Sequence, residues 1–476
     1  MQSPYLHVHL VGIGGIHVSA IAKLLLALGV KVSGSDLAEN ELLEELRQRG
    51  VQIAIGHAAE HVPSETEAIV FSSAANEENP ERAEGRRRSL PAFNSHQFLG
   101  LLGEDEDMDQ IIVTGTHGKS TTTAMIGVMA KATKRLIVAV VGTRVPQFSD
   151  GNLELSDTDG AFDFDYLIAE GDEFDHHFLA YRPRILVINN IEGDHFDVYP
   201  TVEAMLSAYR SLIERVVERG VIIANDDDPL VRRVLSEMNP FLKEHGIRIM
   251  LVGTEDDVDY QIGERRVENG KQIISLFTAR GRVDLTLAIP GEMNARNAAM
   301  CFVVGDCMAL SRGRIATGIE AFQGIWRRLE KIGEKNGITV FSDYGHHPTA
   351  VTKTLEAIKE FYPGRRIVLC FQPHHRNRTK HLFQEFVSCF GLADALVLSE
   401  IYDVKGRDQS EDETVSSRDL IRAVEAYNGE KKVQQTVSYA SNPDEALSML
   451  QRTLLPNDVL VVMGAGDIYK IAYALV

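Results

Sequence analysis

Residues 111–122 read IIVTGTHGKSTT: an apolar run leads into a glycine turn, and the threonine-rich start of a helix follows. A strand, a glycine turn and a helix in this order are typical of a phosphate-binding loop, because backbone N–H groups gather at the helix N-terminus. The general spacing G-x-x-x-x-G-K-[ST] would need glycine at position 113, where Val113 stands, so this loop is a shorter variant. We predict that the following residues hold the phosphates of ATP: Gly115, Thr116, His117, Gly118, Lys119, Ser120 and Thr121.

Two side chains of this loop have distinct expected roles. Lys119 would hold the β- and γ-phosphates, and the Ser120 hydroxyl would bind Mg²⁺. Two later strand-like runs, residues 166–169 and 185–190, are followed by acidic groups and a histidine: Glu170, Asp172, Glu173, Asp175, Glu192, Asp194 and His195. Carboxylates and a neutral imidazole suit a Mg²⁺-ATP site, where moving charge must be neutralised. Solvated loop acids are the alternative for any single one of them.

Another glycine turn, Gly12-Ile13-Gly14-Gly15, lies near the N-terminus between a strand-like run and a helical pattern. Asp36 ends the next strand-like run. This arrangement is typical of a dinucleotide site, in which backbone N–H groups approach a pyrophosphate. A tight turn in any α/β domain remains the alternative, because His17 stands where the third glycine of the motif would be.

Polar segments also occur in the second half of the chain. Residues 225–229 (NDDDP) indicate a turn, and residues 291–298 (GEMNARNA) open a helix that either contacts a base or caps itself. Residues 343–349 (DYGHHPT) and 371–380 (FQPHHRNRTK) follow strand-like runs. Both place polar and basic groups where α/β sheets bind ligands, which favours an anion site over a solvated surface.

The order of these segments predicts an α/β protein of several domains. Short apolar runs alternate with helical stretches almost throughout, which indicates parallel strands. At roughly 100–200 residues per domain, the 476 residues predict about three domains. We expect them at residues 1–106, 107–322 and 323–476, with the acidic stretch 103–109 as a linker.

Composition narrows the function classes. A net charge of −19 disfavours a nucleic-acid binder. No apolar stretch reaches the roughly 18 to 20 residues of a membrane helix, and no basic segment precedes the first apolar run, so we predict a cytoplasmic protein without membrane insertion. The four cysteines form no C-x-x-C pair and are expected to be buried apolar side chains.

Together these motifs resemble those of the Mur ligases over essentially the whole chain. The resemblance implies a Rossmann-like N-terminal domain for a UDP-sugar, a central P-loop ATPase-like domain, and a Rossmann-like C-terminal domain for an amino acid. It implies ligation that needs ATP and Mg²⁺ and passes through an acyl phosphate. Residues 343–348 and 371–374 are most similar to family members that join L-alanine to UDP-N-acetylmuramate in peptidoglycan synthesis, so these are the expected substrates.

The resemblance also implies roles for individual residues. Lys119, His195, His346 and Arg378 would be catalytic. The metal sites would contain Ser120, Glu170 and His195. The nucleotide would be surrounded by Asn294, Arg327 and Asp343. The amino acid or the acyl phosphate would face Tyr344, His346 and Arg378. The UDP-sugar would be lined by Gly12, Gly14, Gly15, Asp36 and Ser73.

Three positions depart from the family pattern, and other functions stay open. His17 stands where the family commonly has glycine, Met293 where it has histidine, and His375 where it has arginine. One alternative is a sibling ligase that attaches a recycled murein peptide to the same sugar nucleotide. A nicotinamide-dependent oxidoreductase and a non-catalytic binding protein are others. The sequence leaves open a monomer or a homodimer, and a preference for alanine, serine or glycine.

Overall fold

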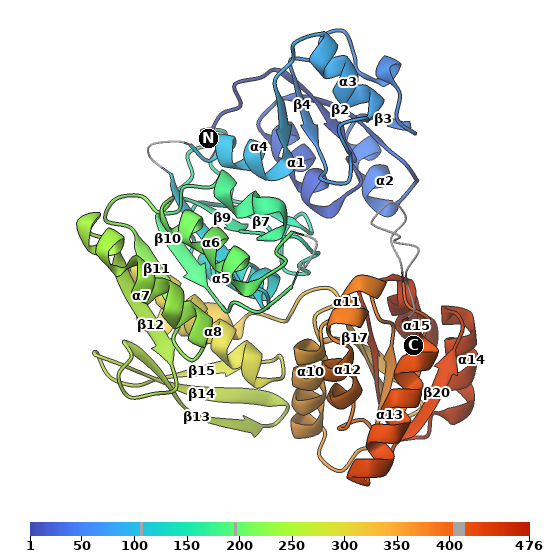
Figure 1. The fold of residues 1–476 in the computed structure, drawn as a ribbon. Coiled ribbons are helices and arrows are strands. Elements are labelled where there is room, and N and C mark those ends of the chain that lie inside the picture. Colours follow the sequence, from blue (N-terminus) through green and yellow to red (C-terminus); the bar gives the residue numbers. More distant parts are fainter. Residues whose placement is uncertain (105–107, 195–197, 403–414) are drawn as a thin grey trace.

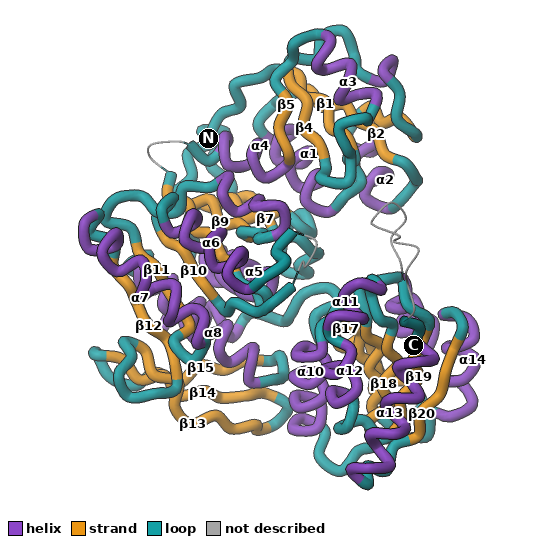
Figure 2. Tube along the Cα trace, viewed as in Figure 1, coloured by secondary structure: helices purple, strands orange, loops and turns teal. Residues whose placement is uncertain are grey.

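The computed structural model describes residues 1–104, 108–194, 198–402 and 415–476. They form three domains, each built on its own sheet (Figure 1), and Figure 2 shows helices beside the strands in each. In Figure 1 the N-terminal domain (blue) lies above the central domain (cyan to yellow), and the C-terminal domain (orange to red) lies beside it. The predicted α/β class with three domains is confirmed.

The N-terminal domain has a five-stranded parallel sheet of order β3-β2-β1-β4-β5. Its strands are β1 (His7–Val11), β2 (Lys31–Asp36), β3 (Gln52–Ile55), β4 (Ala68–Phe71) and β5 (Ala92–Asn94). Its helices are α1 (Ile16–Ala27), α2 (Glu41–Gln48), α3 (Pro80–Arg87) and α4 (Ser95–Leu102), with the short 3-10 turn η1 (Ala59–His61). The glycine turn at 12–15 joins β1 to α1, as the sequence predicts.

The central domain has a ten-stranded sheet of order β15-β14-β13-β12-β11-β10-β6-β9-β7-β8. Its parallel strands are β6 (Asp109–Thr114), β7 (Ile137–Val140), β9 (Tyr166–Glu170), β10 (Ile185–Ile188), β11 (Val221–Asn225) and β12 (Arg248–Gly253). The helices are α5 (Lys119–Ala132), α6 (Val202–Ile213), α7 (Pro229–Glu244), α8 (Glu292–Cys307) and α9 (Arg312–Glu320), with the 3-10 segment η2 (Phe174–Ala180). The strands around β6 are apolar on both faces because helices cover both faces.

At both edges the central sheet departs from the expected all-parallel pattern. The short β8 (Leu153–Leu155) runs antiparallel to β7. At the other edge β13 (Tyr260–Glu268), β14 (Lys271–Thr278) and β15 (Val283–Leu287) form an antiparallel meander. Asn269 and Gly270 join β13 to β14 with φ of 53° and 71°. Two positive φ values suit a type I′ hairpin turn, so this local pair reverses the chain directly.

The C-terminal domain has a six-stranded sheet of order β16-β17-β21-β18-β19-β20, parallel except for the β16–β17 pair. The strands are β16 (Glu330–Lys335), β17 (Ile338–Asp343), β18 (Ile367–Phe371), β19 (Ala395–Ser399), β20 (Thr436–Ala440) and β21 (Val459–Met463). One face packs on α10 (Pro348–Phe361), α12 (Phe383–Cys389) and α13 (Ser417–Lys431), and the other on α14 (Pro443–Thr453) and α15 (Lys470–Leu475). The short α11 (Arg376–His381) and η3 (Asp467–Tyr469) follow β18 and β21.

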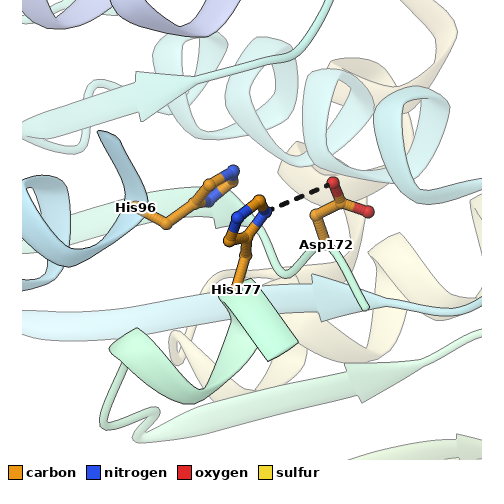
Figure 3. A group of neighbouring side chains, drawn as sticks. All are labelled: His96, Asp172 and His177. Carbon is orange, nitrogen blue, oxygen red and sulfur yellow. Dashed lines mark ion pairs between the residues drawn. The ribbon is translucent and has the colours of Figure 1, made fainter. Parts of the chain in front are cut away.

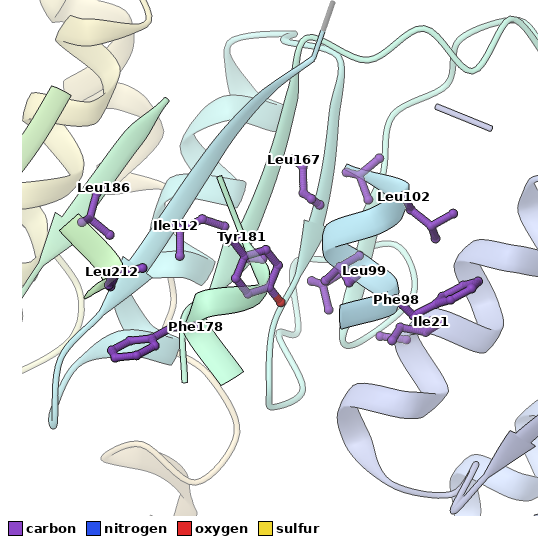
Figure 4. Packing of buried hydrophobic residues seen from close by; sticks show 14 of the residues in the cluster. Ile21, Phe98, Leu99, Leu102, Ile112, Leu167, Phe178, Tyr181, Leu186 and Leu212 are labelled. Carbon is purple, nitrogen blue, oxygen red and sulfur yellow. The ribbon is translucent and has the colours of Figure 1, made fainter. Parts of the chain in front are cut away.

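One apolar cluster continues from the N-terminal into the central domain. Helix α4 carries Phe98, Leu99 and Leu102, which lie between Ile21 of α1 and Leu167 of β9 (Figure 4). On its other side α4 contacts η2. These two domains are therefore held together by buried apolar surface, the largest favourable contribution to such packing.

The cysteines agree in the main with the expectation. Cys301, Cys370 and Cys389 are buried, Cys307 is half-buried, and all four are free thiols. Burial raises the pKa of the Cys307 thiol to about 11 and that of Cys370 to about 12. Across the described parts of the chain, every helix is too short or too polar to cross a membrane.

A glycine in α4 is predicted to be essential for this domain contact. A Cβ on Gly100 would lie 2.2 Å from the backbone oxygen of Ala180 in η2, so either backbone would have to move. We expect Gly100→Ala to lower the melting temperature, because overpacking costs about 1–3 kcal/mol and exceeds the helix-propensity gain of roughly 0.8–1 kcal/mol.

The matched control is Gly313→Ala in α9, where a Cβ would have no neighbour within 4 Å. That variant should melt at the same or a higher temperature, because only the propensity gain remains. Equal shifts of the same sign in both variants, measured by scanning calorimetry, would show that α4 and η2 are not in tight contact.

Candidate functional site

The candidate site lies where β10, β6 and β9 end side by side. The glycine turn between β6 and α5 has φ of 137° at Gly115 and 83° at Gly118. A Cβ on Gly118 would come within 2.7 Å of Asn297 Oδ1 and 2.9 Å of Asn189 Nδ2. Glycine is therefore required both by the backbone conformation and by the close packing. The first N–H groups of α5 point into this turn, and they have no acceptor within the helix.

Lys119 is a nearly buried cation held by Glu173. Its Nζ donates to both carboxylate oxygens of Glu173, at 2.8 and 2.9 Å, and to the carbonyl oxygen of Gly115 at 2.7 Å. Burial alone would lower the pKa of Lys119, but the negative charges of Glu173, Asp172 and Glu170 outweigh it and raise the pKa. Lys119 thus remains charged at the place expected for a triphosphate.

Ser120 and Glu170 form the second part of the site. The Ser120 hydroxyl donates to Glu170 Oε2 at 2.9 Å, and the Gly142 amide donates to Glu170 Oε1 at 2.5 Å. Burial raises the pKa of the Glu170 carboxyl, while these two hydrogen bonds oppose that rise. A buried carboxylate beside a hydroxyl is an oxygen donor set of the kind Mg²⁺ prefers, so the residues present fit this ion. His195, the third expected metal ligand, lies outside the described residues.

The side chains of the turn itself are tied to the segment after β10. The Glu192 amide donates to the Thr116 hydroxyl at 2.8 Å, and His117 Nε2 lies 2.8 Å from Glu192 Oε2. Burial would raise the pKa of the Glu192 carboxyl, but His117 and His347 lower it to about 2. Glu192 therefore carries a negative charge, and the Thr116 and His117 side chains orient the loop. Thr121 is buried in the first turn of α5.

Three residues expected around the nucleotide occupy two different places. Asn294 is buried at the start of α8, where Asn297 donates to its Oδ1 at 3.1 Å, and Asn297 in turn borders Gly118. Arg327 follows α9 and lies in the C-terminal domain, where its guanidinium donates to the carbonyl of Gly466 at 2.9 Å. The Cζ atom of the Arg327 guanidinium lies 4.2 Å from the ring centre of Tyr469.

Asp343 ends β17 and accepts from the amides of Gly345 at 2.6 Å and Leu329 at 2.7 Å. Burial raises the pKa of this carboxyl. Arg327 and Asp343 thus lie together near the start of the C-terminal domain, while Asn294 is linked to the glycine turn through Asn297.

Two hydrogen bonds to the backbone of Trp326, called the clamp below, join this region to the central domain. The Trp326 amide donates to the Arg144 carbonyl at 2.9 Å, and the Thr143 hydroxyl donates to the Trp326 carbonyl at 3.1 Å. Gly142, whose amide contacts Glu170, is in the same segment. The chain therefore passes into the C-terminal domain next to the expected metal ligand.

Tyr344, His346 and Arg378 lie together on the C-terminal domain, facing the central one. Arg378 Nε and Nη2 donate to Asp194 Oδ1 at 3.0 and 2.9 Å, and both side chains are almost fully buried. The ring centres of Tyr344 and His346 are 5.5 Å apart. Burial first, and then the charge of Arg378, hold the pKa of His346 well below its usual value, so its imidazole is neutral. The Thr349 hydroxyl adds a second contact between the domains, to Glu192 Oε1 at 2.7 Å.

The first glycine turn has its own carboxylate partner. Asp36 Oδ2 accepts from the Gly14 amide at 2.8 Å, and the Gly15 amide donates to the Gly12 carbonyl at 3.0 Å. Gly12 has φ of 77°, and a Cβ there would lie 2.8 Å from Ser72 Cβ. Ser73 follows β4 and contacts His177 of the central domain at 2.9 Å.

The three departures from the family pattern lie in different surroundings. His17 stacks on His96 with ring centres 4.1 Å apart. Met293 packs against the apolar core of the C-terminal domain. His375 adopts φ of 66° just before α11, with its ring 4.1 Å from that of His374.

The sequence did not reveal which side chains pair with the expected site residues. Glu173, Asp194 and Glu192 were recognised as acids after strands, but not as the partners of Lys119, Arg378 and Thr349. Asn297 follows Asn294 by three residues, and this helical spacing was the one available signal that it shares the same face.

Comparison with known proteins agrees with this arrangement. The chain matches three segments of one family: the Mur ligase family catalytic domain at residues 7–106, the Mur ligase middle domain at 113–305, and the Mur ligase glutamate ligase domain at 327–466. The UDP-N-acetylmuramate–L-alanine ligase of Desulfotalea psychrophila is 34% identical, over 98% of this chain and 96% of its own length. The chain therefore belongs to the Mur ligase family and is an enzyme of the ligase class.

Two solved structures share the whole fold. The UDP-N-acetylmuramate-alanine ligase of Thermotoga maritima aligns with a TM-score of 0.80 at 24% identity, over 99% of this chain and 98% of its own. A murein peptide ligase of Psychrobacter arcticus aligns with a TM-score of 0.69 at 23% identity, with the same coverage. At these identities the likeness concerns the fold.

The buried ion pair between Arg378 and Asp194 is predicted to hold the C-terminal domain on the central one. Removing one partner of a buried pair costs about 3–5 kcal/mol, because the other charge stays buried without compensation. Arg378→Met and Asp194→Asn should each lower the melting temperature, and the double variant should lose less than the sum of the two. Calorimetry of the four proteins measures this non-additivity.

The control pair is Arg87 and Glu84, whose arginine side chain is 72% exposed. The effects of Arg87→Met and Glu84→Gln on stability should add within about 0.5 kcal/mol, because water screens the charge of the exposed arginine. Strict additivity at Arg378 and Asp194 as well would contradict a coupled pair between the domains.

Proposed function

We propose that this protein joins L-alanine to the carboxylate of UDP-N-acetylmuramate with the hydrolysis of ATP to ADP and phosphate, in peptidoglycan precursor synthesis. Support comes from curated relatives of that activity, such as the one 34% identical over 98% of the chain. The observation that carries the proposal is that one short segment after β10 contacts the glycine turn through Glu192 and Arg378 of the C-terminal domain through Asp194. In that arrangement one domain can energise a carboxylate while another presents the amine.

ATP is proposed to bind across the glycine turn at 115–121, with Asn294, Arg327 and Asp343 around the rest of the nucleotide. The turn offers N–H groups at the start of α5, and Lys119 offers a positive charge. To reach the phosphates, Lys119 exchanges its contact with Glu173 for one with phosphate oxygens. Ser120 and Glu170, together with His195, would hold Mg²⁺, which neutralises charge on the phosphates.

The other substrates are assigned to the outer domains. Residues 1–106 would bind the UDP-sugar through Gly12, Gly14, Gly15, Asp36 and Ser73. Residues 107–322 would carry the nucleotide, and residues 323–476 would carry L-alanine through Tyr344, His346 and Arg378. The guanidinium of Arg378 suits a carboxylate, and the neutral His346 imidazole can accept a hydrogen bond from an ammonium group.

The proposed reaction has two steps, a phosphoryl transfer followed by an acyl transfer. The sugar carboxylate attacks the γ-phosphate, ADP leaves, and the carboxylate becomes an acyl phosphate. The amine of alanine then attacks the acyl carbon, loses a proton, and displaces inorganic phosphate. A free carboxylate is a poor acyl donor, so phosphorylation supplies the leaving group, and the Lys119 charge stabilises the phosphate oxygens during the first transfer.

Phosphate release is expected to require ATP, Mg²⁺, UDP-N-acetylmuramate and L-alanine together. Lys119→Ala should lower turnover by at least roughly 100-fold, because it removes a charge that acts on the moving phosphate. Circular dichroism checks that this variant stays folded. The control is Lys353→Ala, an exposed lysine of α10 paired with Glu356, which should leave turnover unchanged.

The same assay separates the sibling activity from the proposed one. A murein tripeptide in place of L-alanine should give no stimulation of phosphate release. Stimulation by the peptide but not by L-alanine would assign the protein to peptide recycling and overturn the substrate proposed here.

A further inference from the structure

Three imidazole rings form a stack between the N-terminal and central domains. His17 of α1 lies 4.1 Å from His96 of α4, and His96 lies 4.7 Å from His177 of η2, measured between ring centres. The successive ring planes are inclined by only 18° and 14°. Asp172 follows β9 and lies beside His177 (Figure 3). The proposed ligation uses none of these four side chains directly.

A hydroxyl group contacts one ring nitrogen of His96, and another contacts one ring nitrogen of His177. His96 Nδ1 is 3.0 Å from the Tyr181 hydroxyl, and His177 Nε2 is 2.9 Å from the Ser73 hydroxyl. His177 Nδ1 is buried and has no hydrogen-bond partner among the described residues, although it lies 3.8 Å from Asp172 Oδ2. A contact to one ring nitrogen orients the ring and leaves the other nitrogen available to a metal ion. Metal-binding histidines usually have such a partner on the second nitrogen.

The stack is almost closed to water. His96 and His177 are 7% and 5% exposed. Burial lowers the pKa of His17 to about 4 and holds that of His96 well below its usual value, with the neighbouring imidazoles adding to the effect for both. Neutral imidazoles have lone pairs, which is the protonation state that binds metal ions. An unpaired buried nitrogen is costly unless something satisfies it.

We propose that His96, His177 and Asp172 form a binding site for a divalent transition metal ion, with Zn²⁺ as the reference ion. One ligand atom from each residue lies within 4.8 Å of the others. Tetrahedral ligands at about 2.0–2.1 Å from Zn²⁺ are roughly 3.4 Å apart, so the rings must turn slightly toward the ion. The χ2 torsion of histidine has a broad distribution, which permits a small turn of each ring.

The donor set distinguishes this site from the Mg²⁺ site at Ser120 and Glu170. Two imidazoles and one carboxylate suit Zn²⁺, Co²⁺ or Ni²⁺, whereas Mg²⁺ prefers oxygen ligands. The ligands come from α4 on one side and from the central domain on the other. A bound ion would therefore join the proposed sugar-nucleotide domain to the proposed ATP domain, beside the contact between Ser73 and His177.

The proposal is tested on the full chain with cobalt, whose visible absorption reports coordination geometry. After treatment with a chelator, the protein is titrated with Co²⁺ in excess Mg²⁺, and Zn²⁺ is then added as competitor. We expect one Co²⁺ per chain at this site, with a tetrahedral spectrum that Zn²⁺ abolishes. His96→Asn and His177→Asn should each remove that spectrum. Tyr181→Phe should weaken binding by about 10–100-fold, because the ring loses its orienting hydroxyl.

Two controls locate the ion. His176→Ala changes the neighbouring histidine, whose ring faces Tyr199 instead, and should keep the spectrum. His117→Asn disrupts the other close group of metal-binding side chains, His117, Glu192 and His347, and should also keep it. Zn²⁺ should raise the melting temperature of the wild type but not of His96→Asn or His177→Asn.

The proposal fails if chelator-treated protein takes up no Co²⁺ in excess Mg²⁺. It also fails if His117→Asn removes the spectrum while both His96→Asn and His177→Asn keep it, since the ion would then sit at the glycine turn. Circular dichroism of each Asn variant separates lost binding from lost folding, and the two variants test the site independently.

Discussion

One nearly buried cation, the ammonium group of Lys119, determines how this site is built. A charge in so little water needs a permanent counter-charge, and Glu173 provides it with both carboxylate oxygens, at 2.8 and 2.9 Å. The glycine turn, the first turn of α5 and the acids after β9 are all arranged around that pair. In the proposed complex a triphosphate in the turn would take over the role of Glu173, so that Lys119 would exchange one set of anionic partners for another.

The segment after β10 connects this centre to the C-terminal domain. Its Glu192 amide contacts Thr116, its Glu192 carboxylate accepts from Thr349, and its Asp194 pairs with Arg378. One short stretch therefore contacts the glycine turn on one side and the proposed amino acid site on the other. The glycine turn and the third domain are thus joined by groups in direct contact.

Local features were predictable from the sequence, and long-range pairings were not. The strand, turn and helix around Gly115 follow from spacing alone, and so does the place of Asp36 at the end of the strand β2. Lys119 and Glu173 are 54 positions apart, and Arg378 and Asp194 are 184 apart, so their pairing depends on how whole domains pack. The β13–β14 hairpin was overlooked although its signal was local, because Asn269-Gly270 favours a tight reversal. The metal role of His195 stays a prediction.

The clamp between Trp326 and residues 143–144 has a mechanical consequence. A joint of two hydrogen bonds, 2.9 and 3.1 Å long, sits next to Gly142, whose amide donates to Glu170. Rotation about such a joint displaces distant groups widely and nearby ones hardly at all. A rotation of the C-terminal domain about this joint would therefore leave Glu170 and its contact with Gly142 in place.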